Sequence, residues 1–161
     1  MIAAMLLVAA PGVAAASDAD ILREDQDRAA ITQLMWTYAR AIDRFDETAY
    51  ADVFTPDGAF GATKGREALQ KMVTDLKKSR AEREAKGEPQ PAMHHMEGNQ
   101  YIEFVDRDHA RFHYYWITVF GAGGPGSTQA PRVAAVGNGA DDLVRVNGKW
   151  LIKYRNVVAK E

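Results

Sequence analysis

The order in which two hydrophobic patterns occur constrains the fold of this chain more than any other feature. From Asp20 to about Asp46, apolar residues recur every three or four positions, which is typical of an amphipathic helix. A short helix capped by Asp46 follows, and Gly65 to about Lys86 predicts a third. After residue 87, β-branched and aromatic runs predict strands at 93–105, 110–120, 132–146 and 150–158. Helices first and strands last predict an α+β fold.

The links between the predicted strands are short and turn-like. Asn147-Gly148 is a strong signal for a two-residue hairpin. The Gly-rich segment 121–127 also joins two strands, and neither a helix nor a Lys-Thr pair follows it, which argues against a phosphate-binding loop. We therefore expect a four-stranded antiparallel meander that curves around the long first helix, with one more short strand at 59–62.

Size and composition narrow the classes of protein to consider. A chain of 161 residues fits one domain, and its hydrophobic fraction of 47% and charged fraction of 26% are near the averages for globular proteins. The net charge is −2 and acidic residues alternate with basic ones, so we expect no nucleic-acid partner. Without cysteine, the chain has no disulfide, no thiolate nucleophile and no Cys-based metal site.

The first residues bear on the compartment. Ile2 to Ala16 is an apolar run too short to span a bilayer, so we expect no stable membrane insertion. Its length fits a signal peptide, with Ala14 and Ala16 as the small residues before a cleavage site at Ser17, although no Lys or Arg precedes the run. We expect residues 1–16 to be a signal peptide, which predicts a periplasmic or secreted protein if cleaved and a cytoplasmic one otherwise. The alternative is an N-terminal helix that packs on the domain.

Two of the four histidines, His94 and His95, open the first long predicted strand. Because adjacent strand residues point to opposite faces, only one of the two can face a pocket. His95 shares its face with Glu97, Asn99 and Tyr101, which is the more polar set, so a polar cavity would use His95. The same pattern also fits a polar face in contact with water.

Asp43 lies near the end of the first predicted helix, where the helix dipole disfavours a carboxylate. It follows Trp36 by seven residues and so lies on the same side of the helix, toward the apolar side. A buried carboxylate normally needs a partner, and a histidine is a useful one, because the carboxylate fixes the imidazole tautomer and raises its basicity. Asp43 and His95 together would form a general base.

Other chemistries find less support in the sequence. His94, His95 and Glu97 are close together, but strand neighbours diverge and no HExxH occurs, so we expect no metal site. No GxSxG motif is present to indicate a serine nucleophile. We expect no cofactor.

Four segments carry a resemblance to a known family: RAAITQLMWTYARAIDRFDETAYADVFTPDGAF, KGREAL, HMEGNQYIEF and DDLVRVNGKWLIKYRNVV. Over about residues 25–158 the chain resembles the SnoaL-like branch of the nuclear-transport-factor-two-like cone proteins, which includes scytalone dehydratase, hexachlorocyclohexane dehydrochlorinase and bile-acid dehydratase. The resemblance implies a cone-shaped α+β barrel over residues 17–161, with N-terminal helices packed in a curved, mostly antiparallel sheet. It also implies a homo-dimer or homo-trimer that buries the outer face of the sheet.

The resemblance assigns residues to an active site. The catalytic aspartate of the family falls on Asp43 and its histidine on His95. Tyr38 resembles the tyrosine of the bile-acid enzyme, Arg155 resembles the arginine of the dehydrochlorinase, and Asn99 also matches. These residues are therefore candidates for proton transfer and for binding the substrate.

The second histidine of scytalone dehydratase has no counterpart here, because Phe120 or a neighbour lies at its position. Structural alternatives also stay open. Tyr38 fits a helix core residue and Trp116 an ordinary core aromatic. Arg155 fits an ion pair with Asp142 or Glu103.

The aromatic residues near the expected pocket mouth indicate the kind of ligand. Trp36, Tyr101 and Trp116 are candidate substrate-binding residues, as are Asn99 and His113, although the pattern leaves the orientation of His113 open. They favour a small hydrophobic, ring-bearing substrate such as an aryl, polyketide or steroid compound.

We expect a lyase in which His95, held by Asp43, removes a proton, while Tyr38, Arg155 or Asn99 steadies the leaving group or a developing oxyanion. Elimination of water is the leading version, and retro-aldol loss of an aldehyde or loss of halide needs the same base. The alternatives are an isomerase or epoxide hydrolase on the same scaffold and a non-catalytic protein that binds an apolar ligand.

Overall fold

The computed structural model describes residues 17–122 and 129–158. The expected signal peptide, residues 1–16, lies outside the described residues, as does most of the Gly-rich segment 121–127. Three helices precede the main strands: α1 (Asp18–Asp43), α2 (Glu47–Asp52) and α3 (Arg66–Ala85). The strands are β1 (Phe54–Phe60), β2 (Thr63–Lys64), β3 (Met93–Phe104), β4 (His109–Phe120), β5 (Arg132–Val146) and β6 (Lys149–Arg155).

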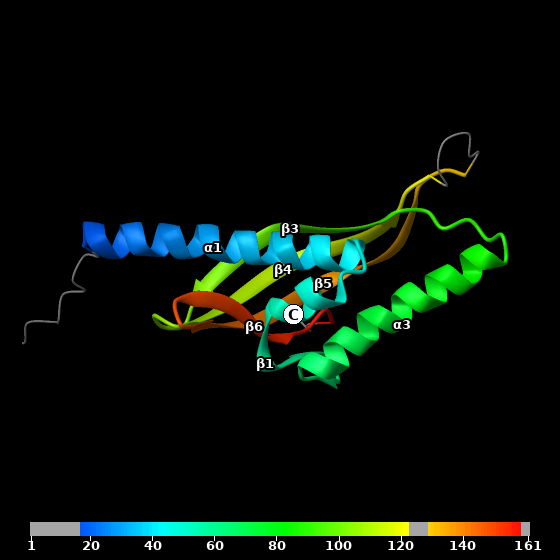
Figure 1. The fold of residues 1–161 in the computed structure, drawn as a ribbon. Helices are drawn as coiled ribbons and strands as arrows, with labels where there is room; N and C mark the ends of the chain where they lie inside the picture. Colours follow the sequence, from blue (N-terminus) through cyan, green and yellow to red (C-terminus); the bar gives the residue numbers. More distant parts are fainter. Residues whose placement is uncertain (1–16, 123–128, 159–161) are drawn as a thin grey trace, which may run out of the picture.

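The strands form one curved, mixed sheet in the order β2-β1-β6-β5-β4-β3. The predicted antiparallel meander is confirmed for β3 to β6, while β1 joins β6 in parallel. Asn147 and Gly148 have φ angles of 50° and 78°, as the two central residues of a type I′ hairpin turn require. The long helix α1 runs lengthwise over the sheet beside β3, and α3 lies beyond α2 at the opposite edge (Figure 1).

The hydrophobic core fills the space between α1 and the concave face of the sheet. Residues of α1 at the predicted helical spacing are buried there, against residues of β4, β5 and β6. The core side chains include Ile31, Leu34, Met35, Tyr38, Ile42, Phe112, Tyr114, Leu143, Trp150 and Ile152. The α+β cone expected from the sequence is therefore confirmed.

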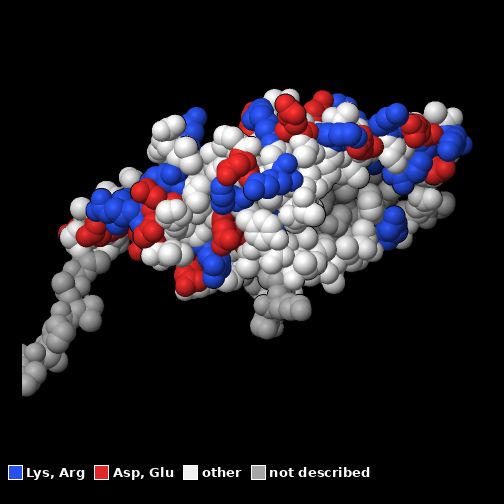
Figure 2. All heavy atoms as spheres, turned by 90° about the horizontal axis from the view of Figure 1, so that it is seen from below, with Lys and Arg blue, Asp and Glu red and all other residues white. Residues whose placement is uncertain are grey.

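The side chains on the surface are mixed in charge. On the face that Figure 2 shows, acidic and basic side chains are interspersed, and a broad uncharged area lies between the charged groups. No helix in the described part of the chain is long and apolar enough to cross a membrane.

The first strand differs from the prediction. The sequence suggested a turn at Pro56-Asp57-Gly58 and a strand only at 59–62, whereas β1 runs through all three residues and ends at Phe60. The pairing of β1 with β6 shifts register between Phe54 and Ala59, and this irregularity accommodates a proline that cannot donate to the sheet.

One glycine marks a close approach inside the core. Gly139 of β5 lies opposite Tyr114 of β4, and a Cβ atom added at Gly139 would lie 2.2 Å from Tyr114 Cζ. The phenol ring fills the space that a side chain would otherwise take. Gly98 of β3, in contrast, has no atom within 4 Å of an added Cβ.

We therefore predict that Gly139→Ala lowers the free energy of unfolding by about 1–3 kcal/mol, the usual cost of forcing extra volume into a packed core. Urea denaturation followed by circular dichroism measures the change. Gly98→Ala is the matched control and should change stability by less than about 0.5 kcal/mol. Equal effects of the two substitutions would contradict the steric explanation.

Candidate active site

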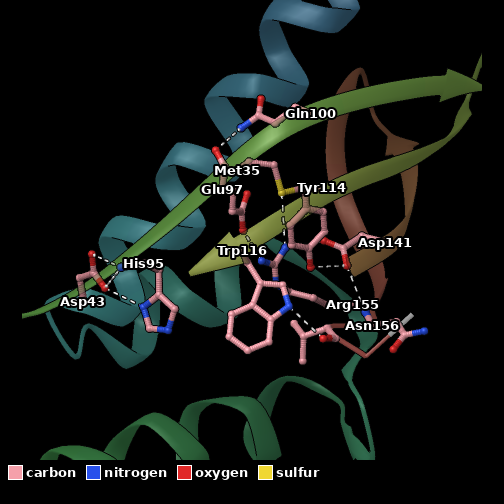
Figure 3. A network of polar contacts seen from close by, with 11 residues as sticks. Met35, Asp43, His95, Glu97, Gln100, Tyr114, Trp116, Asp141, Arg155 and Asn156 are labelled. Carbon is pink, nitrogen blue, oxygen red and sulfur yellow. Dashed lines mark hydrogen bonds and ion pairs between the residues drawn. The ribbon is translucent and has the colours of Figure 1, made fainter. Parts of the chain in front are cut away.

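Asp43 and His95 form the pair that the sequence suggested. The Asp43 carboxylate accepts a hydrogen bond from the His95 backbone N–H, at 3.0 Å from Oδ1, and lies 2.7 Å from Nδ1 of the His95 ring (Figure 3). Because β3 is an edge strand, the N–H groups on its free side have no partner within the sheet, and Asp43 takes one of them. A single carboxylate thus fixes both the backbone and the ring of His95.

The position of Asp43 follows from the way α1 ends. The backbone N–H of Asp46 bonds to Ala41 O and that of Phe45 to Ile42 O, which is the Schellman pattern, with Phe45 at φ 55° in the position that glycine usually takes. Asp43 is therefore the last residue of α1. The helix dipole disfavours a carboxylate there, and the two donors of His95 offset this effect.

The contacts of Asp43 determine which nitrogen of His95 is free. An ionised carboxylate only accepts hydrogen bonds, so the proton of a neutral His95 ring resides on Nδ1. Nε2 then carries the lone pair. The His95 side chain is 24% exposed and that of Asp43 is 7% exposed, so the imidazole can reach a ligand while its partner stays buried.

His95 lines a small pocket on the concave side of the sheet, with a volume of about 220 Å³. The wall contains both apolar and polar side chains. The apolar part comes from Phe60, Trp116, Ala135 and Val157, and the polar part from Tyr38, His95, Glu97, Thr118 and Arg155.

Arg155 lies at the end of β6, buried beneath this pocket with its side chain only 3% exposed. Its Nη2 donates to Glu97 Oε1 and its Nη1 to Asp141 Oδ2 (Figure 3). The rings of Tyr38 and Tyr114 cover the guanidinium, with centroids 3.8 and 4.8 Å from Cζ. Both amino groups of Arg155 are thus engaged within the protein.

The expected role of Arg155 is therefore revised. The resemblance implied that it contacts the leaving group, but its Nε is buried without a partner and its amino groups bind carboxylates. The ion-pair alternative was right in kind and wrong in its partners, since Arg155 pairs with Asp141 and Glu97 and not with Asp142 or Glu103. Asp142 is one residue from Asp141 and so points to the opposite face of β5, and Glu103 lies on the outer face because the register of β3 shifts between Gly98 and Tyr101.

Tyr38 lines the pocket, and its ring lies against the guanidinium of Arg155. Burial raises the pKa of the Tyr38 hydroxyl above its ordinary value, although the Arg155 charge opposes the shift. The group therefore stays protonated at neutral pH and can donate a hydrogen bond into the pocket.

Asp141 is fully buried behind Arg155. Burial raises the pKa of the Asp141 carboxyl to about 7, although the Arg155 charge, the Asn156 N–H and the Tyr114 hydroxyl each lower it. The charge of Glu97 raises the pKa of Asp141 further, because the single guanidinium of Arg155 neutralises only one of the two carboxylates around it.

Three of the expected substrate-binding residues lie elsewhere. The pairing of β3 with β4 shifts register between Gly98 and Tyr101, and Asn99 at this bulge has a φ of 49°. The bulge reverses the alternation along β3, so Asn99 and Tyr101 lie on the outer face of the sheet and not in the His95 pocket. His113 of β4 pairs with Tyr101 and lies on the same outer face, between the buried Phe112 and Tyr114. There, the rings of Tyr101 and His113 pack against each other, with their centroids 5.9 Å apart.

The two tryptophans have different positions. Trp116 lines the pocket, and its Nε1 donates to Val157 O at 2.9 Å, which holds the chain after β6 against the pocket (Figure 3). Trp36 is 60% exposed on α1, beside Arg40, and does not line the pocket. The prediction for Trp36 is wrong. Asp43 is buried because β3 covers the very end of α1, and this cover does not extend to Trp36 on the same side of the helix.

The sequence reasoning missed several residues of the site. It did not single out Thr118, Phe60 or Asp141, and it considered Glu97 only as part of a polar strand face and of a metal site that it rejected. One signal was present for the bulge, since Gly98 followed by Asn99 inside a strand indicates an irregularity. Among the described residues, no group of three or more His, Asp and Glu side chains is placed to hold a metal ion.

The tautomer of His95 can be tested without a substrate. We predict that neutral His95 carries its proton on Nδ1, which long-range ¹H–¹⁵N correlation spectra of the imidazole measure directly. Asp43→Asn removes the acceptor and should redistribute the proton toward Nε2. The exposed His94 is the internal control and should be unaffected by this substitution.

A second prediction concerns pH and stability. Asp141 has a folded-state pKa of about 7, above its ordinary 3.8, so the stability it contributes is complete below pH 4 and is lost as the pH rises through 7. Asp141 contributes at most about 1.4 kcal/mol per pH unit to the decline of the free energy of unfolding with pH. We expect Asp141→Asn to flatten the decline measured by urea denaturation between pH 4 and 7. The neighbouring, half-exposed Asp142 offers the control Asp142→Asn, and equal slopes in both variants would contradict the assignment.

Comparisons with known proteins identify the family and the fold of this chain. The model of the SnoaL-like domain matches residues 23–156. No curated protein matches the sequence. Similar solved structures include an NTF2-like protein with a cystatin-like fold from Novosphingobium aromaticivorans, at 22% identity, 85% of this chain and 84% of that chain, with a TM-score of 0.66.

Two further structures have the same fold. A protein of unknown function from Mycobacterium tuberculosis is 22% identical over 84% of this chain and 72% of that chain, with a TM-score of 0.66. A protein from Catenulispora acidiphila, solved in complex with S-DNPA, is 23% identical over 81% of this chain and 91% of that chain, with a TM-score of 0.61. Since the family model covers most of the sequence, this chain belongs to the SnoaL-like domain family, whose fold is the NTF2-like α+β cone.

Proposed function

We propose that this protein is a cofactor-independent lyase in which His95, held by Asp43, acts as the general base on a small ring-bearing substrate. The observation that carries the proposal is the contact between Asp43 Oδ1 and His95 Nδ1 at 2.7 Å, at the edge of a mostly apolar pocket. This contact leaves the basic Nε2 of His95 for a ligand. The family supports the coarser function, an enzyme that binds a small molecule.

The proposed reaction is elimination of water. His95 Nε2 takes a proton from a carbon atom, the electron pair of the C–H bond forms the new double bond, and the C–O bond breaks. A proton supplied by solvent completes the leaving water, and His95 returns its proton to solvent. Tyr38, kept protonated by its burial, would donate a hydrogen bond to the departing oxygen.

The pocket also supports the proposed class of substrate. Phe60 and Trp116 supply flat apolar surface, and the volume of about 220 Å³ fits a molecule of one or two rings. A relative of the same fold from Catenulispora acidiphila has been solved with the small molecule S-DNPA. We therefore favour a hydrophobic ring compound that carries a hydroxyl β to a carbonyl, where an acidic C–H and a leaving group lie on adjacent carbons.

We predict that His95→Ala lowers kcat by about 10²–10⁴-fold on such a β-hydroxy ketone, the usual contribution of a general base. The conjugated product absorbs at longer wavelength than the substrate, so its formation is followed by ultraviolet absorbance. Asp43→Asn should also lose activity, because the asparagine amide no longer fixes the Nδ1–H tautomer.

The neighbouring residue gives the control. His94 lies on the exposed outer face of β3, so His94→Ala should retain the activity of the unmodified chain. Turnover that survives in His95→Ala with the fold intact would reject the lyase proposal and favour a binding protein.

A further inference from the structure

Glu97 is the acidic residue of the pocket wall, and the proposed reaction gives it no role. It lies two residues after His95 on the same face of β3, before the bulge, and its side chain is 6% exposed. Glu97 Oε1 accepts a hydrogen bond from Arg155, and Figure 3 shows the two side chains pointing toward each other. Among the hydrogen bonds between described residues, none reaches Glu97 Oε2.

Arg155 is less available to a ligand than Glu97. Its amino groups bind Glu97 and Asp141, and its Nε is buried. No other Lys or Arg lines the pocket in the part of the chain that the structure describes. The carboxylates of Asp43 and Glu97 thus lie in or behind the pocket wall with one permanent cation, and Asp141, whose pKa burial raises to about 7, adds only part of a further negative charge. The resulting negative field disfavours an anionic ligand.

The spacing of His95 and Glu97 also carries information. Side chains two residues apart on a strand lie on the same face about 7 Å from each other, which is close to the span of a substituted six-membered ring. A ring that presents its reacting carbon to His95 would therefore place a substituent near Glu97. In an otherwise apolar cavity, a hydroxyl is the neutral substituent that best donates a hydrogen bond to a carboxylate oxygen.

We propose that Glu97 is a specificity-determining residue whose Oε2 accepts a hydrogen bond from a free hydroxyl of the substrate. This proposal rests on the proposed function for the location of the substrate. The pocket selects neutral ring compounds that carry an alcohol or phenol group and rejects the corresponding ethers and carboxylates. Arg155 holds Glu97 in place and neutralises part of its charge.

Three matched probes test this selectivity without turnover: 2-naphthol, 2-methoxynaphthalene and 2-naphthoate, with binding followed by tryptophan fluorescence of the full chain. The unmodified protein should bind 2-naphthol at least about tenfold more tightly than the ether, since a hydrogen bond to a charged group typically contributes that much. The naphthoate should bind most weakly.

Glu97→Gln keeps the size of the side chain and an acceptor for Arg155, while it turns an N–H₂ donor toward the ligand. We expect this variant to bind the naphthol and the ether with nearly equal affinity and to bind naphthoate better than the unmodified protein does. Glu103→Gln is the control. Glu103 lies on the same strand beyond the bulge, half-exposed on the outer face, and its substitution should leave the tenfold preference unchanged.

Equal affinity of the unmodified protein for 2-naphthol and its methyl ether would overturn the proposal, and this comparison needs no variant. An unchanged preference in a folded Glu97→Gln protein would overturn it as well. Both results are independent of the general base. If His95→Ala stayed active, the lyase proposal would fail, but the preference for 2-naphthol over its ether would remain.

Discussion

The burial of one guanidinium organises much of this structure. Arg155 lies beneath the pocket, and a buried cation is tolerated only where opposite charges and hydrogen bonds compensate for lost hydration. Its partners come from separate elements, Glu97 from β3 and Asp141 from β5, with Tyr38 of α1 and Tyr114 of β4 stacked on its faces. The cluster therefore fixes the register of the inner sheet face against α1.

This cluster and the Asp43–His95 pair have different parts in the site. Arg155 is almost fully buried and its amino groups bind two carboxylates, whereas His95 is partly exposed at the edge of the sheet. The first gives the pocket a rigid polar floor, and the second gives it a basic nitrogen beside open space. A preorganised site of this kind requires little reorganisation when a ligand binds.

The bulge at Asn99 separates the two halves of β3. Before it, alternate residues face the pocket, and after it the alternation is reversed, so that polar residues of the second half lie on the outer face. The same strand therefore contributes His95 and Glu97 to the interior and Tyr101 to the exterior. The likeness to solved structures extends to the fold, while the side chains in this pocket decide its chemistry.

The sequence by itself determined the order of the main helices and strands, the hairpin at Asn147-Gly148 and the rule that His94 and His95 point to opposite faces, because these depend on local periodicity and on turn residues close in the chain. Only the tertiary structure decided which carboxylates meet Arg155, that Asn99 and Tyr101 leave the pocket, and that Trp36 stays exposed. Those outcomes depend on strand register and on one irregular residue. A shift of a single residue moves every later side chain to the opposite face, and no local pattern fixes such a shift.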